Sequence, residues 1–235
     1  MGAQLHRKWR VWRNPTLTLE ALQSTREEER IVVEARYTLP EVQARLMLRY
    51  EIAPSGEVTI HQSLRATQGV QVPPMMRFGM RMDLPEGYEH LRYYGRGPAE
   101  NYLDRKASTF VGRYTQRVDE QFYPYIRPQE NGTKSDLRWW WIGHRSGQGL
   151  LISAPKPFSA SALHYSQEDL DEGLSKQQHH SRELTPRKEI FLTIDGAQMG
   201  LGCENSWGAW PLSHYRLPYG DYDFMFTIAP RRLLE

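Results

Sequence analysis

The chain has 235 residues, of which 39% are hydrophobic and 25% are charged, and its formal net charge is +2. This balance is ordinary for a globular protein, and the length allows one large β domain or two small ones. The basic residues are scattered along the chain, so the charge pattern gives no reason to expect a nucleic-acid-binding protein.

Cys203 is the only cysteine, which excludes an intrachain disulfide and a cysteine-rich metal site. No apolar run reaches the roughly 18 residues that a membrane span needs. The first residues are not followed by the apolar segment of a signal peptide. We therefore expect neither a membrane nor a nucleic acid among the partners of this chain.

Alternating apolar and polar residues predict antiparallel strands in the first half of the chain. We expect these strands at residues 30–37, 44–52, 58–65 and 75–84. In the last of them, a period of two places large apolar side chains on one face and arginines on the other. The apolar row consists of Met76, Phe78, Met80 and Met82. We expect it to lie in the core, although a methionine-rich surface also suits promiscuous binding.

The second half of the chain shows the same alternation. We expect strands at residues 109–114, 136–144, 150–152, 159–165, 189–195, 214–217 and 222–229. Pro155 and Pro157 predict a break between the third and fourth of these strands. Ser166, which acidic residues follow, predicts a short helix. About a dozen strands with at most one or two short helices indicate an all-β fold, a large antiparallel β-sandwich.

Residues 93–105 carry the densest polar motif of the chain. Two glycines permit positive φ or a close approach of neighbours, and the proline after them cannot donate to a strand ladder. The motif therefore predicts a rigid turn that presents Glu100, Asn101 and Arg105. Such a set suits a site for a polyol or a buried hydrogen-bond network. The network is the more frequent arrangement, because buried polar groups must be paired.

Three stretches resemble, in the same order, motifs of the C-terminal small-chain domain of the glycoside hydrolase family 2 β-galactosidases. They are residues 95–105 (Gly-Arg-Gly-Pro-Ala-Glu-Asn-Tyr-Leu-Asp-Arg), residues 123–132 (Tyr-Pro-Tyr-Ile-Arg-Pro-Gln-Glu-Asn-Gly) and residues 194–207 (Ile-Asp-Gly-Ala-Gln-Met-Gly-Leu-Gly-Cys-Glu-Asn-Ser-Trp). The resemblance is weaker towards the N-terminus.

This resemblance implies a galactose mutarotase-like supersandwich, with residues 1–235 forming a single domain of a longer multidomain β-galactosidase that hydrolyses terminal β-D-galactosides. The family's two catalytic glutamates lie in a central barrel domain, so the resemblance implies no catalytic residue and no cofactor in this chain. Mg²⁺, and often Na⁺, would be bound by other domains. The implied partners are a galactoside, the remaining domains or large subunit, and further copies in an oligomer. The compartment, bacterial cytoplasm or periplasm, stays open.

Read from the residues alone, a retaining glycosidase needs two carboxylates about 5–5.5 Å apart. Glu100 with Asp104, or Glu100 with Glu130, supplies such a pair by composition. Because the resemblance places the catalytic glutamates outside this chain, we expect the chain by itself not to hydrolyse glycosides.

Trp207 matches the family tryptophan that reaches into the catalytic pocket and stacks on the sugar. The apolar C–H face of a pyranose packs well on an indole, which is worth a few kcal/mol at most. The alternative is a tryptophan of the core. If a sugar cleft like that of the mutarotases is retained, the resemblance implies that it is lined by Glu100, Asn101, Arg105, Glu130 and Asn131. For Glu130 and Asn131 a structural role is an equal alternative.

Two further functions stay open. A non-catalytic carbohydrate-binding sandwich would use Trp207 and the run Trp139–Trp141 as platforms. An aldose 1-epimerase-like enzyme would need a general acid and base, often His with Glu, and His164 is the best-placed histidine for that role. The residues Gln-Gln-His-His at 177–180 look like a bare metal motif. Neighbouring side chains on a strand face opposite ways and no third ligand is evident, so we expect no metal there.

Overall fold

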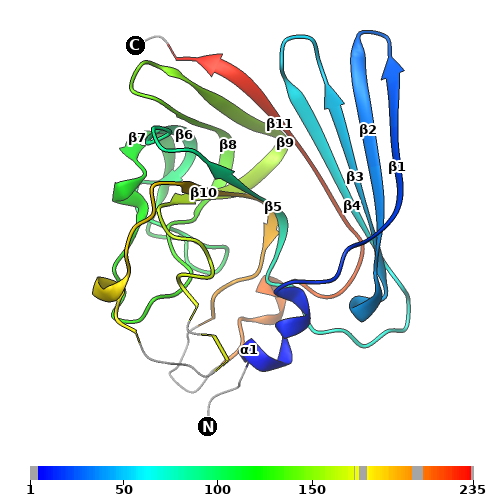
Figure 1. Ribbon diagram of the computed structural model, residues 1–235. Helices are drawn as coiled ribbons and strands as arrows, with labels where there is room; N and C mark the ends of the chain where they lie inside the picture. Colours follow the sequence, from blue (N-terminus) through cyan, green and yellow to red (C-terminus); the bar gives the residue numbers. More distant parts are fainter. Residues whose placement is uncertain (1–4, 172, 175–178, 203–208, 234–235) are drawn as a thin grey trace.

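The computed structural model describes residues 5–171, 173–174, 179–202 and 209–233 (Figure 1). Within these ranges the secondary structure is almost entirely strand, with a single α-helix, α1 (Leu5–Lys8), of four residues. No helix in the described part of the chain is long and apolar enough to cross a membrane. The predicted all-β fold with at most one or two short α-helices is confirmed.

The first strands are β1 (Thr18–Glu27), β2 (Arg30–Leu39), β3 (Ala44–Ile52), β4 (Val58–Ala66), β5 (Arg77–Leu84) and β6 (His90–Gly97). The others are β7 (Phe110–Arg117), β8 (Lys134–Gly143), β9 (Gln148–Leu163), β10 (Ile190–Gln198) and β11 (Tyr222–Arg232). Five 3-10 turns lie between them, at Arg10–Trp12, Pro40–Val42, Asp119–Gln121, Ser181–Glu183 and Ser213–Tyr215.

The strands pair antiparallel in the order β1-β2-β3-β4-β11-β9-β8-β6-β7, while β10 pairs with β5 and β9. Figure 1 shows β1–β4 standing as a wall on the right and the later strands forming a lobe on the left. The last strand, β11, joins these two parts because it pairs with β4 on one side and β9 on the other.

The two strands predicted at 150–152 and 159–165 belong to one continuous strand of 16 residues, β9. Its first part pairs with β11 up to Ser153, and its last part pairs with β10 from Ser159 onward. Pro155 and Pro157 lie between these two ladders. The ladder of β9 with β8 is also irregular there, between Ser153 and Phe158. The missing N–H groups of the prolines therefore interrupt no regular ladder, and the expected break does not occur.

Two other predictions were wrong. Residues 213–215 form a 3-10 turn where a strand at 214–217 was expected. The segment after Ser166 forms only a turn, although Ser166 and Asp169 bond each other as at a helix start: Asp169 N donates to Ser166 Oγ at 3.1 Å and Ser166 N to Asp169 Oδ2 at 2.8 Å. A cap without a following apolar helix face does not sustain a helix.

The core lies between the wall and the lobe and within the lobe. It includes Phe78 and Leu84 of β5, Ile60 and Leu64 of β4, and Phe226 of β11. Met80 and Met82 are half-buried and pack against this core, as expected, whereas Met76 precedes β5 and is 39% exposed. The methionines within β5 therefore belong to the core, whereas Met76, which precedes the strand, does not.

Candidate functional site

The polar motif after β6 is bound to the proline-rich segment that precedes β8. The carboxylate of Glu100 accepts a hydrogen bond from the backbone N–H of Gly132 at 2.7 Å and from the hydroxyl of Tyr125. Arg105 Nη2 lies 2.5 Å from the same carboxylate and donates to the Tyr125 hydroxyl at 3.1 Å. Glu100 thus ties two of the three motifs together. Its side chain is 11% exposed, while that of Arg105 is 50% exposed.

The two asparagines of these motifs are structural. Asn101 is fully buried, and its amide donates to the carbonyls of Arg96 and Ala99 while its oxygen accepts from Ser135. Asn131 is 2% exposed and bonds both backbone groups of Tyr123. With their hydrogen-bonding groups engaged inside the protein, neither side chain is presented to a ligand.

The close-approach alternative for the motif's glycines is correct. Gly95 and Gly97 are absent from the positive-φ residues of the described chain. A Cβ on Gly97 would lie 2.4 Å from the hydroxyl of Tyr93 and 3.0 Å from the ring of Tyr114. A Cβ on Gly95 would lie 2.5 Å from Leu137. The glycines therefore let β6 pack against its neighbours.

Glu130 belongs to a second cluster, which contains the buried Asp195 and the partly buried Arg77. Arg77 Nη2 lies 3.0 Å from Glu130 Oε2, and Arg77 Nη1 lies 3.7 Å from Asp195 Oδ2. Glu130 Oε1 also accepts hydrogen bonds from Thr133 and Gln198. The cluster joins the start of β5, the proline-rich segment and the end of β10. Glu130 therefore has a structural role and, at 29% side-chain exposure, also reaches the surface.

Burial controls the ionisation of this cluster. It raises the pKa of Asp195 to about 6, against the opposing effect of Arg77. Burial also acts to lower the pKa of Arg77, but the carboxylates of Asp195 and Glu130 raise it above its ordinary value. The arginine is thus charged at every physiological pH, whereas Asp195 changes its charge near pH 6.

Lys134, at the start of β8, is a buried cation. Lys134 is 1% exposed, and its Nζ donates to the carbonyl of Gly132 at 3.2 Å. Burial lowers the pKa of Lys134 to about 8. Burial likewise raises the pKa of Tyr102 well above its ordinary value. Tyr102, within the motif of residues 93–105, and Lys134, at the start of β8, thus both lie in a poorly solvated environment.

Asp104 anchors the third motif. Its carboxylate accepts hydrogen bonds from the backbone N–H groups of Leu201 at 3.1 Å and Gly202 at 2.8 Å. A Cβ on Gly200 would lie 2.5 Å from the same carboxylate. Asp104 is therefore used as a backbone acceptor. Trp207 and Cys203 lie outside the described residues.

The remaining candidates are His164 and the tryptophans of β8. Nδ1 of His164 is buried and has no hydrogen-bond partner among the described residues. Trp140 and Trp141 are 0% and 2% exposed, and Trp140 stacks on Tyr93 at 5.1 Å. Trp140 and Trp141 therefore offer no surface for a sugar, whereas Trp139 of the same run is only partly buried.

One surface cavity touches a predicted residue. Its volume is about 390 Å³. Its lining consists of His6, Arg127, Pro128, Gln129, Glu130, Gln167, Leu170, Asp171 and Gly173. Among the described residues, no three His, Cys, Asp or Glu side chains are grouped so that they could hold a metal ion. The lining of the cavity is thus mainly polar and includes Glu130.

Sequence reasoning missed the structural roles of Arg77, Asp195, Asp104 and Lys134. Arg77 was expected on the polar face of its strand, and Asp195 lay unremarked within a motif. A signal was available for Asp195, the one charge of β10 (Ile190–Gln198), because a charge inside an otherwise apolar strand is a candidate for burial with a partner. No spacing rule connects Arg77 with Asp195, because they are far apart in the sequence.

Comparison with known proteins gives the family. Residues 3–228 match the family model described as "Beta galactosidase small chain". A β-galactosidase of Priestia megaterium is 30% identical over 234 residues, which is 98% of this chain and 22% of that protein. The β-galactosidase BgaC of Bifidobacterium adolescentis is 34% identical over 193 residues, which is 79% of this chain and 18% of that protein.

A solved structure, the GalM/aldose epimerase homologue from C. elegans, overlaps 91% of this chain and 69% of its own with a TM-score of 0.44 and 11% identity. The fold assignment rests on the strand pairing described above, not on that overlap. The family model spans residues 3–228, and the two relatives match 98% and 79% of this chain but only about a fifth of their own length. This chain belongs to the β-galactosidase small-chain family.

Proposed function

We propose that this chain is the small-chain domain of an enzyme that hydrolyses terminal β-D-galactosides. The observation that carries the proposal is the family match over residues 3–228. The relatives named β-galactosidase are matched over only about a fifth of their length. The catalytic glutamates and the Mg²⁺ and Na⁺ sites are then expected in the rest of the enzyme, which also forms an oligomer.

The acids of the motifs support a non-catalytic role for this chain. Glu100 is bound by Arg105, Tyr125 and Gly132, and Glu130 is bound by Arg77. A nucleophile or an acid–base carboxylate must be free to reach the glycosidic bond. These carboxylates instead hold the loops of the domain in place.

We further propose that the chain completes the galactoside site with Trp207. The anchoring of Leu201 and Gly202 by Asp104 supports this, because it fixes the backbone immediately before residues 203–208. Arg105 and Glu130 keep enough exposure to contact the same ligand.

Hydrolysis of 4-nitrophenyl β-D-galactoside tests the proposal. We expect no turnover by this chain alone and turnover by the complete enzyme that contains it. Trp207→Ala in the complete enzyme should reduce kcat/KM about 10-fold or more, which corresponds to roughly 1.4 kcal/mol of lost stacking. Phe110→Ala is the control, because Phe110 is an exposed aromatic residue of β7 at 77% exposure.

Two results would overturn these statements. Turnover by the isolated chain would show that it holds its own carboxylate pair, and Glu100, Asp104 and Glu130 would then be the residues to change. An unaltered kcat/KM in the Trp207→Ala enzyme would remove the stacking role while leaving the family assignment intact.

A further inference from the structure

The wall formed by β1–β4 has one polar and one apolar face. On the polar face, Arg49 bonds Glu27 and Glu51 at 3.0 and 3.1 Å, and Arg36 bonds Glu34 at 2.6 Å. The opposite face carries the cross-strand pairs Ile31–Ile52, Val33–Tyr50 and Ala35–Leu48. A sheet face of this composition is normally buried against another layer.

The apolar face is only partly covered within the described chain. Near β4 and β11 it forms core, with Ile60 and Leu64 each 3% exposed. Towards β1 and the far ends of β2 and β3 it is open. Four large side chains there form what we call the open apolar face: Leu19, Leu22, Ile31 and Ile52, which are 51%, 63%, 45% and 37% exposed.

A bulge in β1 contributes to this face. Leu19 pairs with Tyr37 and Leu22 pairs with Ala35, and the register shifts between them. Residues three apart in a regular strand point to opposite faces, and the extra residue of a bulge brings them to the same face. Both leucines therefore lie on the side of Tyr37 and Ala35, away from the ion pairs.

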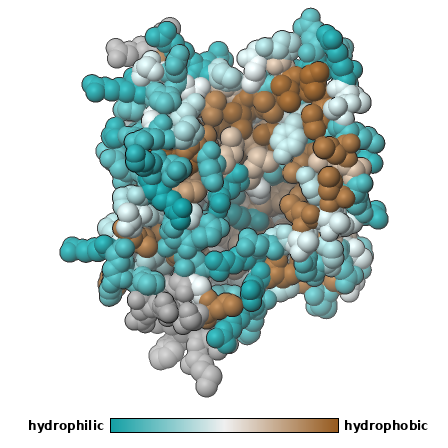
Figure 2. All heavy atoms as spheres, in the orientation of Figure 1, coloured by the Kyte–Doolittle hydropathy of each residue, from teal (hydrophilic) through white to brown (hydrophobic). Residues whose placement is uncertain are grey.

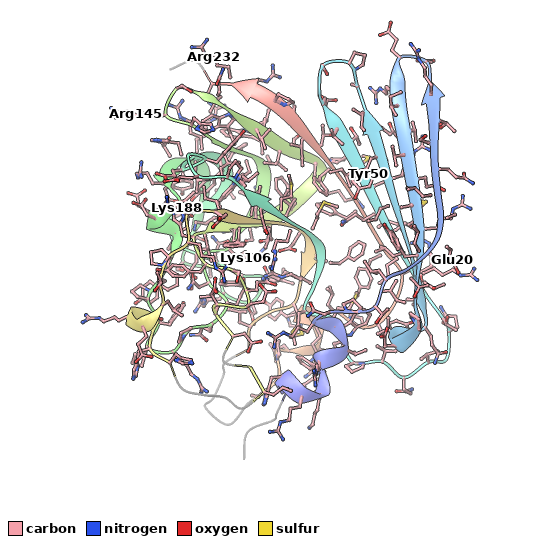
Figure 3. The ribbon with its side chains drawn as sticks, viewed as in Figure 1. Glu20, Tyr50, Lys106, Arg145, Lys188 and Arg232 are labelled. Atoms are coloured by element: carbon pink, nitrogen blue, oxygen red, sulfur yellow. The ribbon has the colours of Figure 1, made fainter. Side chains whose placement is uncertain are left out.

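The figures show the same asymmetry. In Figure 2 apolar surface gathers over the upper part of the wall, beside the region where the surface is hollowed between the wall and the lobe. In Figure 3 Tyr50 lies on the hollow side of the wall, whereas Glu20 points outward from β1. Tyr50 pairs with Val33 and Ile60, which places it on the apolar face.

We propose that the open apolar face is the surface on which another domain of the same enzyme docks. The inference rests on the proposed function, because it takes the covering partner to be the rest of a β-galactosidase. The lengths of the relatives favour this occupant: the match covers 98% of this chain but 22% of the Priestia megaterium protein, so most of that polypeptide lies outside it. Several large apolar side chains exposed together on one sheet face are typical of a surface that is buried in assembly. Arg26, which pairs with Ile31, is the charged residue of β1 on this face.

Thiol labelling tests this proposal face by face. In a Cys203→Ser background, Leu22→Cys places a thiol on the open apolar face and Gln23→Cys places one on the polar face of the same strand. Both positions are exposed in this chain. We expect both thiols to react rapidly with a maleimide in the isolated chain. In the complete enzyme Leu22→Cys should react at least about 10-fold more slowly, and Gln23→Cys should be unchanged.

Each other outcome overturns the inference. Equal reactivity of Leu22→Cys in the chain and in the complete enzyme would show that no domain covers the face. Equal slowing of both thiols would show that the protection is not specific to the face. If Leu22→Cys is labelled slowly in the isolated chain and its labelling rate rises on dilution, a second copy of the chain is the occupant. Galactoside hydrolysis by the complete enzyme is measured separately, so the proposed function can fail while the docking stands, and the reverse.

Discussion

Replacing Arg77 with methionine tests whether its ion pairs with Glu130 and Asp195 stabilise the fold. Arg77 lies 3.0 Å from Glu130 and 3.7 Å from Asp195, and its own side chain is 19% exposed. Asp195 is 2% exposed, so the substitution leaves a carboxylate in the interior without a cation. Removing one partner of a buried pair costs about 3–5 kcal/mol. In a chain of this length that lowers Tm by about 6–20 °C.

The pH dependence makes this prediction specific. Because the pKa of Asp195 is about 6 in the folded state, its carboxyl is protonated at pH 5 and needs no cation there. The Tm difference between wild type and Arg77→Met should therefore be large at pH 8 and smaller at pH 5, as followed by circular dichroism. Adding Asp195→Asn to Arg77→Met should restore part of the loss at pH 8.

Arg36→Met is the control, because Arg36 forms a surface ion pair with Glu34 and is 57% exposed. Surface pairs are worth about 0–1 kcal/mol, so its Tm should change by at most about 4 °C. A Tm for Arg77→Met within about 2 °C of wild type at pH 8 would refute the reasoning. A difference that does not change with pH would show that Asp195 is not the group left unpaired.

Three further predictions concern the same region. Lys134 has its pKa lowered to about 8 against about 10.4 in an unfolded chain, so the folded state binds fewer protons and stability rises with pH between these values. Lys134→Met should therefore raise Tm at pH 7, and this gain should vanish near pH 10–11 in a series of thermal scans. A gain that is independent of pH would contradict a lowered pKa of Lys134. Glu100→Gln should cost about 1–3 kcal/mol in urea unfolding, because it weakens the bonds to Arg105 and Tyr125; an unchanged midpoint would show that the two motifs are held elsewhere. Gly97→Ala should cost about 1–3 kcal/mol through overlap with its neighbours, whereas Gly220→Ala, which meets nothing within 4 Å, should not.

The strands were predictable where one face is buried and the other is not. The prediction for β3 coincides with its observed bounds, Ala44–Ile52, because apolar and polar residues alternate along it except at Met47. β1 was missed because nine of its ten residues are exposed, so burial imposes no pattern on its sequence. The bulge in β1 also interrupts the period of two that sequence reasoning depends on.

The motifs identified which segments matter but not how their side chains are used. Glu100, Asn101 and Asn131 had two predicted uses, the lining of a retained sugar cleft and a structural hydrogen-bond network, and the structure shows them in hydrogen bonds that join loops. Both uses require the same residue types, since carboxylates and amides serve loops and ligands alike. Only the positions of Gly132, Ser135 and the other partners separate the two, and those positions depend on the tertiary fold.

The pairing of β4 with β11 has a consequence for synthesis. Val58 pairs with Ile228 and Leu64 with Tyr222, so strands near opposite ends of the chain complete one sheet. During translation β1–β4 emerge first and leave the outer edge of β4 without its neighbour until residues 222–232 have been made. Such distant pairing slows folding, and an unpaired edge is prone to pair with other chains. Chains that terminate before β11 should therefore aggregate on release from the ribosome.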